Sequence, residues 1–392
     1  MDKIKPKDLV FIKEHGKTRY VGSVGDIRYH ASMSDSGGPE RSIVVSGNGL
    51  GYLLSNFQLI LDFHIWLNNT TVESAAKQLK VAIESTLKED DGKTSGVLKD
   101  IYKSFFGMVE KIGDVAGKFG MSGLFTKYVD YESKLSDVVA KYPMALSLYQ
   151  VGENNIWTMW QNILTPPIHE LFGRWNPEAE KYELIFRQAP FEKSDWKNLK
   201  SYKLHPLVLK EYDMGNSDSD VKTFYLGVLP GSSISREKAL VIDDLDGSAT
   251  SYIDKTLWPI YGYRPMIVEF KYFQREKLND FSGAGKLMSD MSEMMYNWYK
   301  NNSSFLSGSI TIENVDDKNN LMEYPLIGEK IKMMDGEFYI ESTENAWRYE
   351  GEATRTLTLT RGFKYSDDGD YSGLIDNIGQ KISKTEEGIR KV

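Results

Sequence analysis

"EKIKMMDGEFYIESTENAWRYEG" (residues 329–351), followed closely by "RTLTLTRG" (residues 355–362), carries the clearest strand pattern in the chain. Residues 355–360 alternate polar and apolar side chains, which is the period of a half-buried β-strand. Asp335-Gly336 stands between two apolar runs, and such a dipeptide is a hairpin signal. We therefore expect an antiparallel β-meander in this region.

A second stretch near the N-terminus has a similar order of features. It reads "DLVFIKEHGKTRYVGSVGDIRYH" (residues 8–30), then a loop, then "RSIVVSG" (residues 41–47). Both regions contain a strand, a turn with glycine, a strand that opens on tyrosine, an Arg-Tyr pair and a strand that begins with arginine. Two explanations are open: an internal duplication, or the general likeness of any two meanders. A duplication would give two related barrels, and barrels have no exposed strand edges.

The chain between these two regions changes character more than once. Apolar residues recur at helical spacing from Val72 to Leu87 and again over 97–116, and a further helix is expected over 127–141. Strand-like segments and one Met-rich helix (residues 287–298) follow. We expect an α+β, mainly β chain with these parts: a first tube-like barrel (1–67), a helical insertion (68–150), a middle α+β domain that lends strands to either barrel (151–305), a second tube-like barrel (306–365) and a polar tail (366–392).

Composition excludes several classes of protein. The 392-residue chain has no cysteine, which rules out disulfides, thiolate zinc sites and cysteine nucleophiles. Its net charge of −8 argues against a general DNA-binding surface, because such a surface needs a basic field to displace counterions from phosphates. No apolar run has the length of a membrane-spanning helix or of a signal peptide. We expect a globular protein with no cofactor and no metal.

Three short motifs resemble nucleotide or calcium sites but lack essential residues. Gly47, Gly49 and Gly51 have G-x-G-x-G spacing instead of the dinucleotide fingerprint G-x-G-x-x-G. "SGAGKLM" (residues 282–288) lacks the first glycine of a P-loop and the hydroxyl residue after its lysine. "NSDSD" (residues 216–220) lacks the glycine and the glutamate that an EF-hand loop needs at its sixth and twelfth positions. We interpret all three as ordinary turns and loops.

No catalytic constellation emerges from the sequence. The five histidines are far apart, and there is no H-E-x-x-H or G-x-S-x-G motif. Glu153 and Glu170 flank a Trp-rich segment and are the pair that a glycosidase would use, but acidic pairs are common in a chain with 56 acidic residues. The Gly-rich amphipathic segment 105–125 is expected to pack on protein, with a lipid surface as the alternative. We predict no catalytic, cofactor-binding or metal-binding residue.

Four stretches together resemble one protein family. They are the opening meander with "RSIVVSGNGLGYLL", then "NNIWTMWQNILTPPIHELF" with "YELIFRQAPFEKSDWKNL", then "NSDSDVKTFYLGV" with "IYGYRPMIVEF", and last "IGEKIKMMDGEFYIESTENAWRYEGEATRTLTLTRG". In this order they are similar to the central baseplate hub proteins of contractile phage tails and phage-tail-like bacteriocins. The resemblance covers most of the chain outside 68–150 and includes no catalytic motif.

The resemblance implies a trimeric structural adaptor that is not an enzyme. Each subunit of such a hub holds two tube-protein-like barrels, so three chains match a six-fold tail tube to a three-fold spike. Implied partners are the spike, the tube or tube initiator, the end of the tape-measure protein and other inner baseplate proteins, with DNA passing through the lumen without specific binding. The implied place is a tail baseplate or tail-like particle assembled in the host cytoplasm. A tail-associated cell-wall hydrolase and a tail-tip carbohydrate-binding module are the alternatives.

Tryptophan is a frequent anchor of protein interfaces, and the chain has eight tryptophans. We expect most of them to lie in the core, with some in interfaces. The candidates are Trp157, Trp160, Trp175, Trp196, Trp258 and Trp347.

Overall fold

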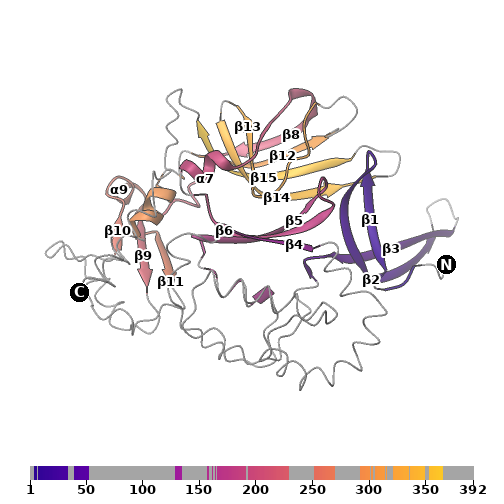
Figure 1. Ribbon diagram of the computed structural model, residues 1–392. Helices are drawn as coiled ribbons and strands as arrows, with labels where there is room; N and C mark the ends of the chain where they lie inside the picture. Colours follow the sequence, from indigo (N-terminus) through magenta and orange to yellow (C-terminus); the bar gives the residue numbers. More distant parts are fainter. Residues whose placement is uncertain are drawn as a thin grey trace, which may run out of the picture.

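The computed structural model describes residues 4–33, 39–52, 129–134, 157–228, 251–269, 292–315, 321–348 and 353–364, apart from a few residues inside these ranges. The chain is mainly β, as the sequence predicts. Its described strands form one six-stranded sheet and three three-stranded sheets. Figure 1 shows the six-stranded sheet above the strands β4, β5 and β6, with β1–β3 at one side.

The N-terminal region forms an antiparallel meander of β1 (Leu9–Glu14), β2 (Lys17–Met33) and β3 (Pro39–Gly49). We call it the first meander. His15 and Gly16 make a two-residue turn between Glu14 and Lys17, and both have positive φ (50° and 81°). This is the backbone that a two-residue hairpin turn of the primed type requires, and glycine adopts it without strain.

The C-terminal region forms a second antiparallel meander of β13 (Lys330–Met333), β14 (Gly336–Ala346) and β15 (Thr354–Lys364). We call it the second meander. Met333 pairs with Gly336 across a two-residue turn in which Met334 has φ 49°. Strand order, strand direction and turn length are thus the same as in the first meander, as a duplication predicts.

The second meander is the centre of a larger sheet with the order β7-β13-β14-β15-β12-β8. The added strands are β7 (Ser201–Lys203), β8 (Leu209–Gly215) and β12 (Leu306–Glu313), and a 3-10 turn, η2 (Pro206–Val208), joins β7 to β8. One face of this sheet covers an apolar core. Its most deeply buried members are Val208, Ile312, Ile331, Ile340, Leu357 and Leu359, all at 0% exposure.

A third sheet has the order β4-β6-β5, from Val129–Lys134, Lys181–Gln188 and His169–Asn176. We call it the bridging sheet, because its side chains reach both meanders. The predicted helix over 127–141 is therefore wrong at Val129–Lys134, because these residues form β4, which pairs in parallel with β6. The alternation Val129-Asp130-Tyr131 is a strand pattern that helical spacing in the flanking residues concealed. The remaining boundaries of the predicted domains stay predictions.

The fourth sheet combines β10 (Ser251–Ile253), β9 (Phe224–Val228) and β11 (Pro265–Glu269), next to the short helix α9 (Trp258–Tyr261). Residues 292–299 are helical and pack on it through Tyr296, whose ring stacks on Tyr252 at 4.2 Å. Arg361 of β15 donates to the carbonyl of Trp298 at 3.1 Å and lies over its ring. This arginine ties the helix to the six-stranded sheet.

Candidate functional site

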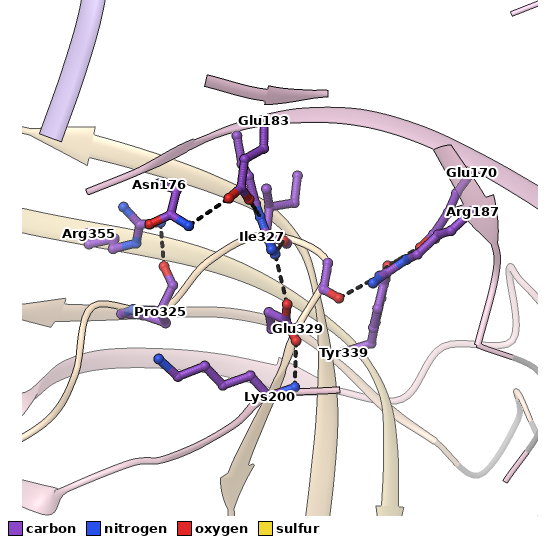
Figure 2. A network of polar contacts seen from close by, with 12 residues as sticks. Glu170, Asn176, Glu183, Arg187, Lys200, Pro325, Ile327, Glu329, Tyr339 and Arg355 are labelled. Carbon is purple, nitrogen blue, oxygen red and sulfur yellow. Dashed lines mark hydrogen bonds and ion pairs between the residues drawn. The ribbon is translucent and has the colours of Figure 1, made fainter. Parts of the chain in front are cut away.

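The bridging sheet is joined to the second meander by a buried charged cluster. Arg187 on β6 forms an ion pair with Glu170, its cross-strand neighbour on β5. The hydroxyl of Tyr339, on β14, donates to Glu170 at 2.8 Å and accepts from Arg187 Nη2 at 2.8 Å (Figure 2). Burial, and then the Glu170 charge, raise the pKa of Tyr339 well above its usual value. The phenol therefore stays neutral and keeps both hydrogen bonds.

A second ionic group reinforces this contact closer to the other end of the bridging sheet. Arg174 of β5 binds Glu183 at 2.8 Å and Glu329 at 2.9 Å, and it donates to the carbonyl of Ile327 at 2.9 Å (Figure 2). Glu329 also accepts from the backbone N–H of Lys200 at 2.6 Å. Arg174 and Glu329 thus join chain segments far apart in sequence, and they tie the bridging sheet to the start of β13.

The hairpin of the second meander also contacts a short helix, α7 (Lys193–Asn198). Trp196 is fully buried, and its indole N–H donates to Glu337 at 2.6 Å. Lys330 binds the same carboxylate at 3.1 Å. Burial opposes the ionisation of Glu337, but the hydrogen bonds from Trp196 and Lys332 and the nearby Lys330 charge outweigh it and lower its pKa.

The bridging sheet reaches the first meander through aromatic side chains. The indole N–H of Trp175, on β5, donates to the backbone carbonyl of Thr18 at 2.7 Å. The hydroxyl end of Tyr182, on β6, lies so close to Gly173 and Gly51 that a Cβ at either glycine would collide with it. Burial, followed by the proximity of Tyr20, raises the pKa of Tyr182 to about 12.

One tyrosine connects the two meanders directly. The ring of Tyr324 lies 4.2 Å from the guanidinium of Arg19, on β2, and 3.9 Å from that of Arg355, on β15. Arg355 also donates to Asn345 at 2.7 Å and to the carbonyl of Pro325 at 2.6 Å. Cation–π contacts between buried groups are worth up to about 2 kcal/mol each. The two meanders and the bridging sheet therefore hold one another at fixed positions.

The two meanders differ most in the exposure of equivalent strand residues. "RSIVV" (41–45) in β3 corresponds to "RTLTL" (355–359) in β15, so Ile43 corresponds to Leu357 and Val45 to Leu359. Leu357 and Leu359 are fully buried, whereas Ile43 and Val45 are 47% and 42% exposed. Tyr29, the cross-strand neighbour of Ile43, is 61% exposed. The first meander thus exposes an apolar face, whereas the equivalent residues of the second meander are buried.

Of the candidate tryptophans that the structure describes, two are buried and three are half-buried. Trp175 and Trp196 are buried, and both also donate hydrogen bonds that join elements. Trp157, Trp258 and Trp347 are half-buried, and Trp160 lies outside the described residues. Sequence reasoning did not identify Arg187, Tyr339 or Tyr182, because nothing in their local sequence signals a partner more than a hundred residues away.

The rejected motifs find plain structural roles where they are described. Gly47 opposes an irregularity of β2 between Val24 and Asp26, where a Cβ would collide with the carbonyl of Ser23. Asp218 of the "NSDSD" loop pairs with Arg264 at 3.2 Å. Glu170 is engaged by Arg187 and Tyr339. Glu153, "SGAGKLM" (282–288) and the segment 105–125 lie outside the described residues.

The described part of the chain has neither a metal-binding cluster nor a membrane-spanning helix. It contains no cluster of histidine and carboxylate side chains that would hold a metal ion. It also contains no helix long and apolar enough to cross a membrane.

The chain was compared with known proteins in three ways. No family model matches it, and no curated protein is significantly similar. Among solved structures it is similar to a tail protein from Neisseria meningitidis MC58 (TM-score 0.49, 13% identity, 93% of this chain and 85% of that one). It is also similar to the prophage MuSo2 43 kDa tail protein from Shewanella oneidensis (0.48, 13%, 95% and 84%) and to the prophage tail protein gp18 from Listeria monocytogenes EGD-e (0.42, 12%, 98% and 86%). With TM-scores below 0.5, these likenesses do not establish a common family.

Proposed function

We propose that this chain is the structural hub of a contractile tail baseplate, a trimeric adaptor between a three-fold spike and a six-fold tail tube. The observation that carries the proposal is the presence of two equivalent meanders in one chain, with the same strand order and the same two-residue turn. Closed assemblies of identical subunits have rotational symmetry, and a three-fold ring of such chains presents six similar modules.

The contacts of the bridging sheet support this role mechanically. A six-fold rim requires the two modules of one chain to keep a fixed spacing and orientation. Trp175 and Tyr182 hold the sheet on the first meander, and Glu170 and Arg187 hold it on the second. A protein that must template the first ring of a tube needs this kind of preorganisation, because every misplaced module costs binding free energy.

The proposed hub binds the tube or tube initiator on one face and the spike on the other. Its lumen holds the end of the tape-measure protein and later lets DNA pass. The net charge of −8 is consistent with such passage, since phosphates bind strongly only where cations replace their counterions. A lumen lined with lysine and arginine would contradict this part of the proposal. The assembled particle is a phage tail or a tail-like bacteriocin.

Co-expression with the neighbouring genes tests the proposal. We expect the chain to co-purify with the spike protein and with the tube or tube-initiator protein, and to release no fragments from host cell walls. The hydrolase alternative would be favoured if the chain cleaved cell walls and the variant Glu170→Gln lost this activity while it stayed folded. Binding to isolated walls with no affinity for spike or tube would favour a carbohydrate-binding module.

A further inference from the structure

We propose that β3 of one copy of this chain pairs edge to edge with β8 of a second copy, so that the first meander of one subunit extends the six-stranded sheet of the next. This inference rests on the trimer of the proposed function and names the surfaces through which it forms. It follows from two strand edges, one in each half of the molecule, that both expose apolar side chains.

The first edge belongs to β3. Among the described strands β3 pairs only with β2, and no described strand lies along its other side. Ile43 and Val45 lie on one face together with their cross-strand neighbours Tyr29 and Ile27. β3 begins with Pro39, Glu40 and Arg41, but its remaining residues, 42–49, include no proline and no charge. Proline and several charges are the usual protection of an edge strand against pairing, so this edge is suited to accept a strand.

The second edge belongs to β8. Among the described strands it pairs only with β12, where Tyr212 is opposite Ile310. Paired residues lie on the same face of a sheet, and Ile310 points into the apolar core at 1% exposure. Tyr212 therefore lies on the core face, yet it is 57% exposed. The apolar layer under the six-stranded sheet thus reaches the surface at β8.

The internal duplication indicates how the two edges fit together. In the second meander, β15 is covered along the equivalent edge by the antiparallel strand β12, and Leu357 and Leu359 are buried. An antiparallel strand beside β3 would bury Ile43 and Val45 in the same way. When β8 supplies that strand with its core face aligned, Ile43 and Val45 meet Tyr212, and two exposed apolar surfaces are buried together.

The strand that meets β3 comes from another copy. Within one chain β3 and β8 lie well apart (Figure 1). The two edges are different surfaces, so the contact is head-to-tail, and head-to-tail contacts that close make a ring. A three-fold ring uses each edge once and leaves no open edge of either kind. The described β1 edge is the competing surface, and the test below distinguishes the two.

Cysteine cross-linking tests the pairing directly, because the chain has no native cysteine. The variant Val44→Cys with Asp213→Cys places one thiol on each edge, on the faces opposite to the apolar ones. We expect a short bismaleimide to convert it to covalent dimers and closed trimers. The matched control Val10→Cys with Asp213→Cys moves the first thiol to β1 and should stay uncross-linked at the same protein concentration.

Charged substitutions give a second readout. Ile43→Glu with Val45→Glu should raise the concentration at which the trimer half-dissociates by about tenfold or more, because the interface would bury carboxylates without partners. Ile260→Glu, at an isoleucine that is 70% exposed on α9, is the control and should leave that concentration unchanged. Circular dichroism confirms that the variants stay folded.

The results separate this inference from the hub proposal. The pairing is overturned if the trimer is unaffected by Ile43→Glu with Val45→Glu and the variant Val44→Cys with Asp213→Cys is not cross-linked. The hub proposal would be unaffected by that result. Cross-linking of the Val10→Cys control alone would place the contact at β1 instead of β3 and would also overturn the pairing. A chain that is monomeric at every concentration and does not bind spike or tube removes the hub proposal itself.

Discussion

The first and second meanders have the same strand order and the same turn, but they are stabilised differently. The second meander is the centre of a six-stranded sheet, and a buried Arg187–Glu170 pair joins it to the bridging sheet. The first meander has three described strands, is held by Trp175 and Tyr182, and exposes its apolar face. The second meander is completed within the subunit, and under the proposed pairing the first meander would be completed by a neighbouring subunit. The same sequence pattern would then serve folding in one place and assembly in the other.

The largest expected effect breaks the equivalence of Leu357 and Ile43. Leu357→Asp places a carboxylate in a fully buried position, which costs several kcal/mol and should prevent folding. Ile43→Asp places the same group at the equivalent position, which is 47% exposed, and should leave the chain folded. Far-UV circular dichroism and resistance to protease measure both. Equal loss of structure in the two variants would contradict the difference in burial.

The next effect sharpens the contrast between the two attachments of the bridging sheet. Arg187→Met leaves Glu170 largely buried without its cation and should lower the free energy of unfolding by about 3 kcal/mol. Trp175→Phe removes one hydrogen bond to the first meander and should cost about 1 to 2 kcal/mol. Urea denaturation measures both variants. A larger loss in Trp175→Phe would mean that the first attachment is the stronger one.

Alkaline pH should weaken the attachment to the first meander through Tyr182. Its pKa in the folded chain is raised from the ordinary value of 10.0 to about 12, so the folded state holds this proton more tightly than the unfolded state. The contribution is complete below about pH 10 and is lost as pH rises toward 12, to a total of about 2 to 3 kcal/mol.

Tyr182→Phe is the variant that tests this contribution. It should reduce the fall in unfolding free energy between pH 9 and pH 11, relative to the unmodified chain. The comparison is made by urea denaturation at the two pH values. An unchanged fall would show that Tyr182 titrates normally in the folded chain.

The smallest expected effect concerns a salt bridge at the surface of the first meander. The side chains of Asp26 and Arg28 are 2.6 Å apart and are 50% and 73% exposed. Exposed ion pairs of this kind contribute little to stability. Arg28→Ala should therefore leave the urea midpoint unchanged within error, and a clear decrease would indicate that Arg28 has a further contact in the assembled state.

Sequence reasoning predicted the parts of this structure that depend on local pattern. Alternation over 355–360 and the turn signals at His15-Gly16 and Asp335-Gly336 identified both meanders, although the second turn lies one residue earlier than predicted, because Gly336 already pairs with Met333. The bridging sheet was harder, since β4 lies far from β6 in sequence and was assigned to a helix. The contacts of Arg187 with Tyr339 and of Arg19 with Tyr324 join residues distant in sequence, so only the folded chain reveals them. The exposure of Ile43 could not be predicted either, because the sequence around Ile43 resembles that around the buried Leu357.

The molar mass of the purified chain in solution tests the central claim most directly. Light scattering coupled to size-exclusion chromatography should give three times the 44.7 kDa mass of one chain, and averaged electron micrographs down the axis should show six similar lobes. A stable monomer, or a ring whose symmetry is not three-fold, would contradict the account.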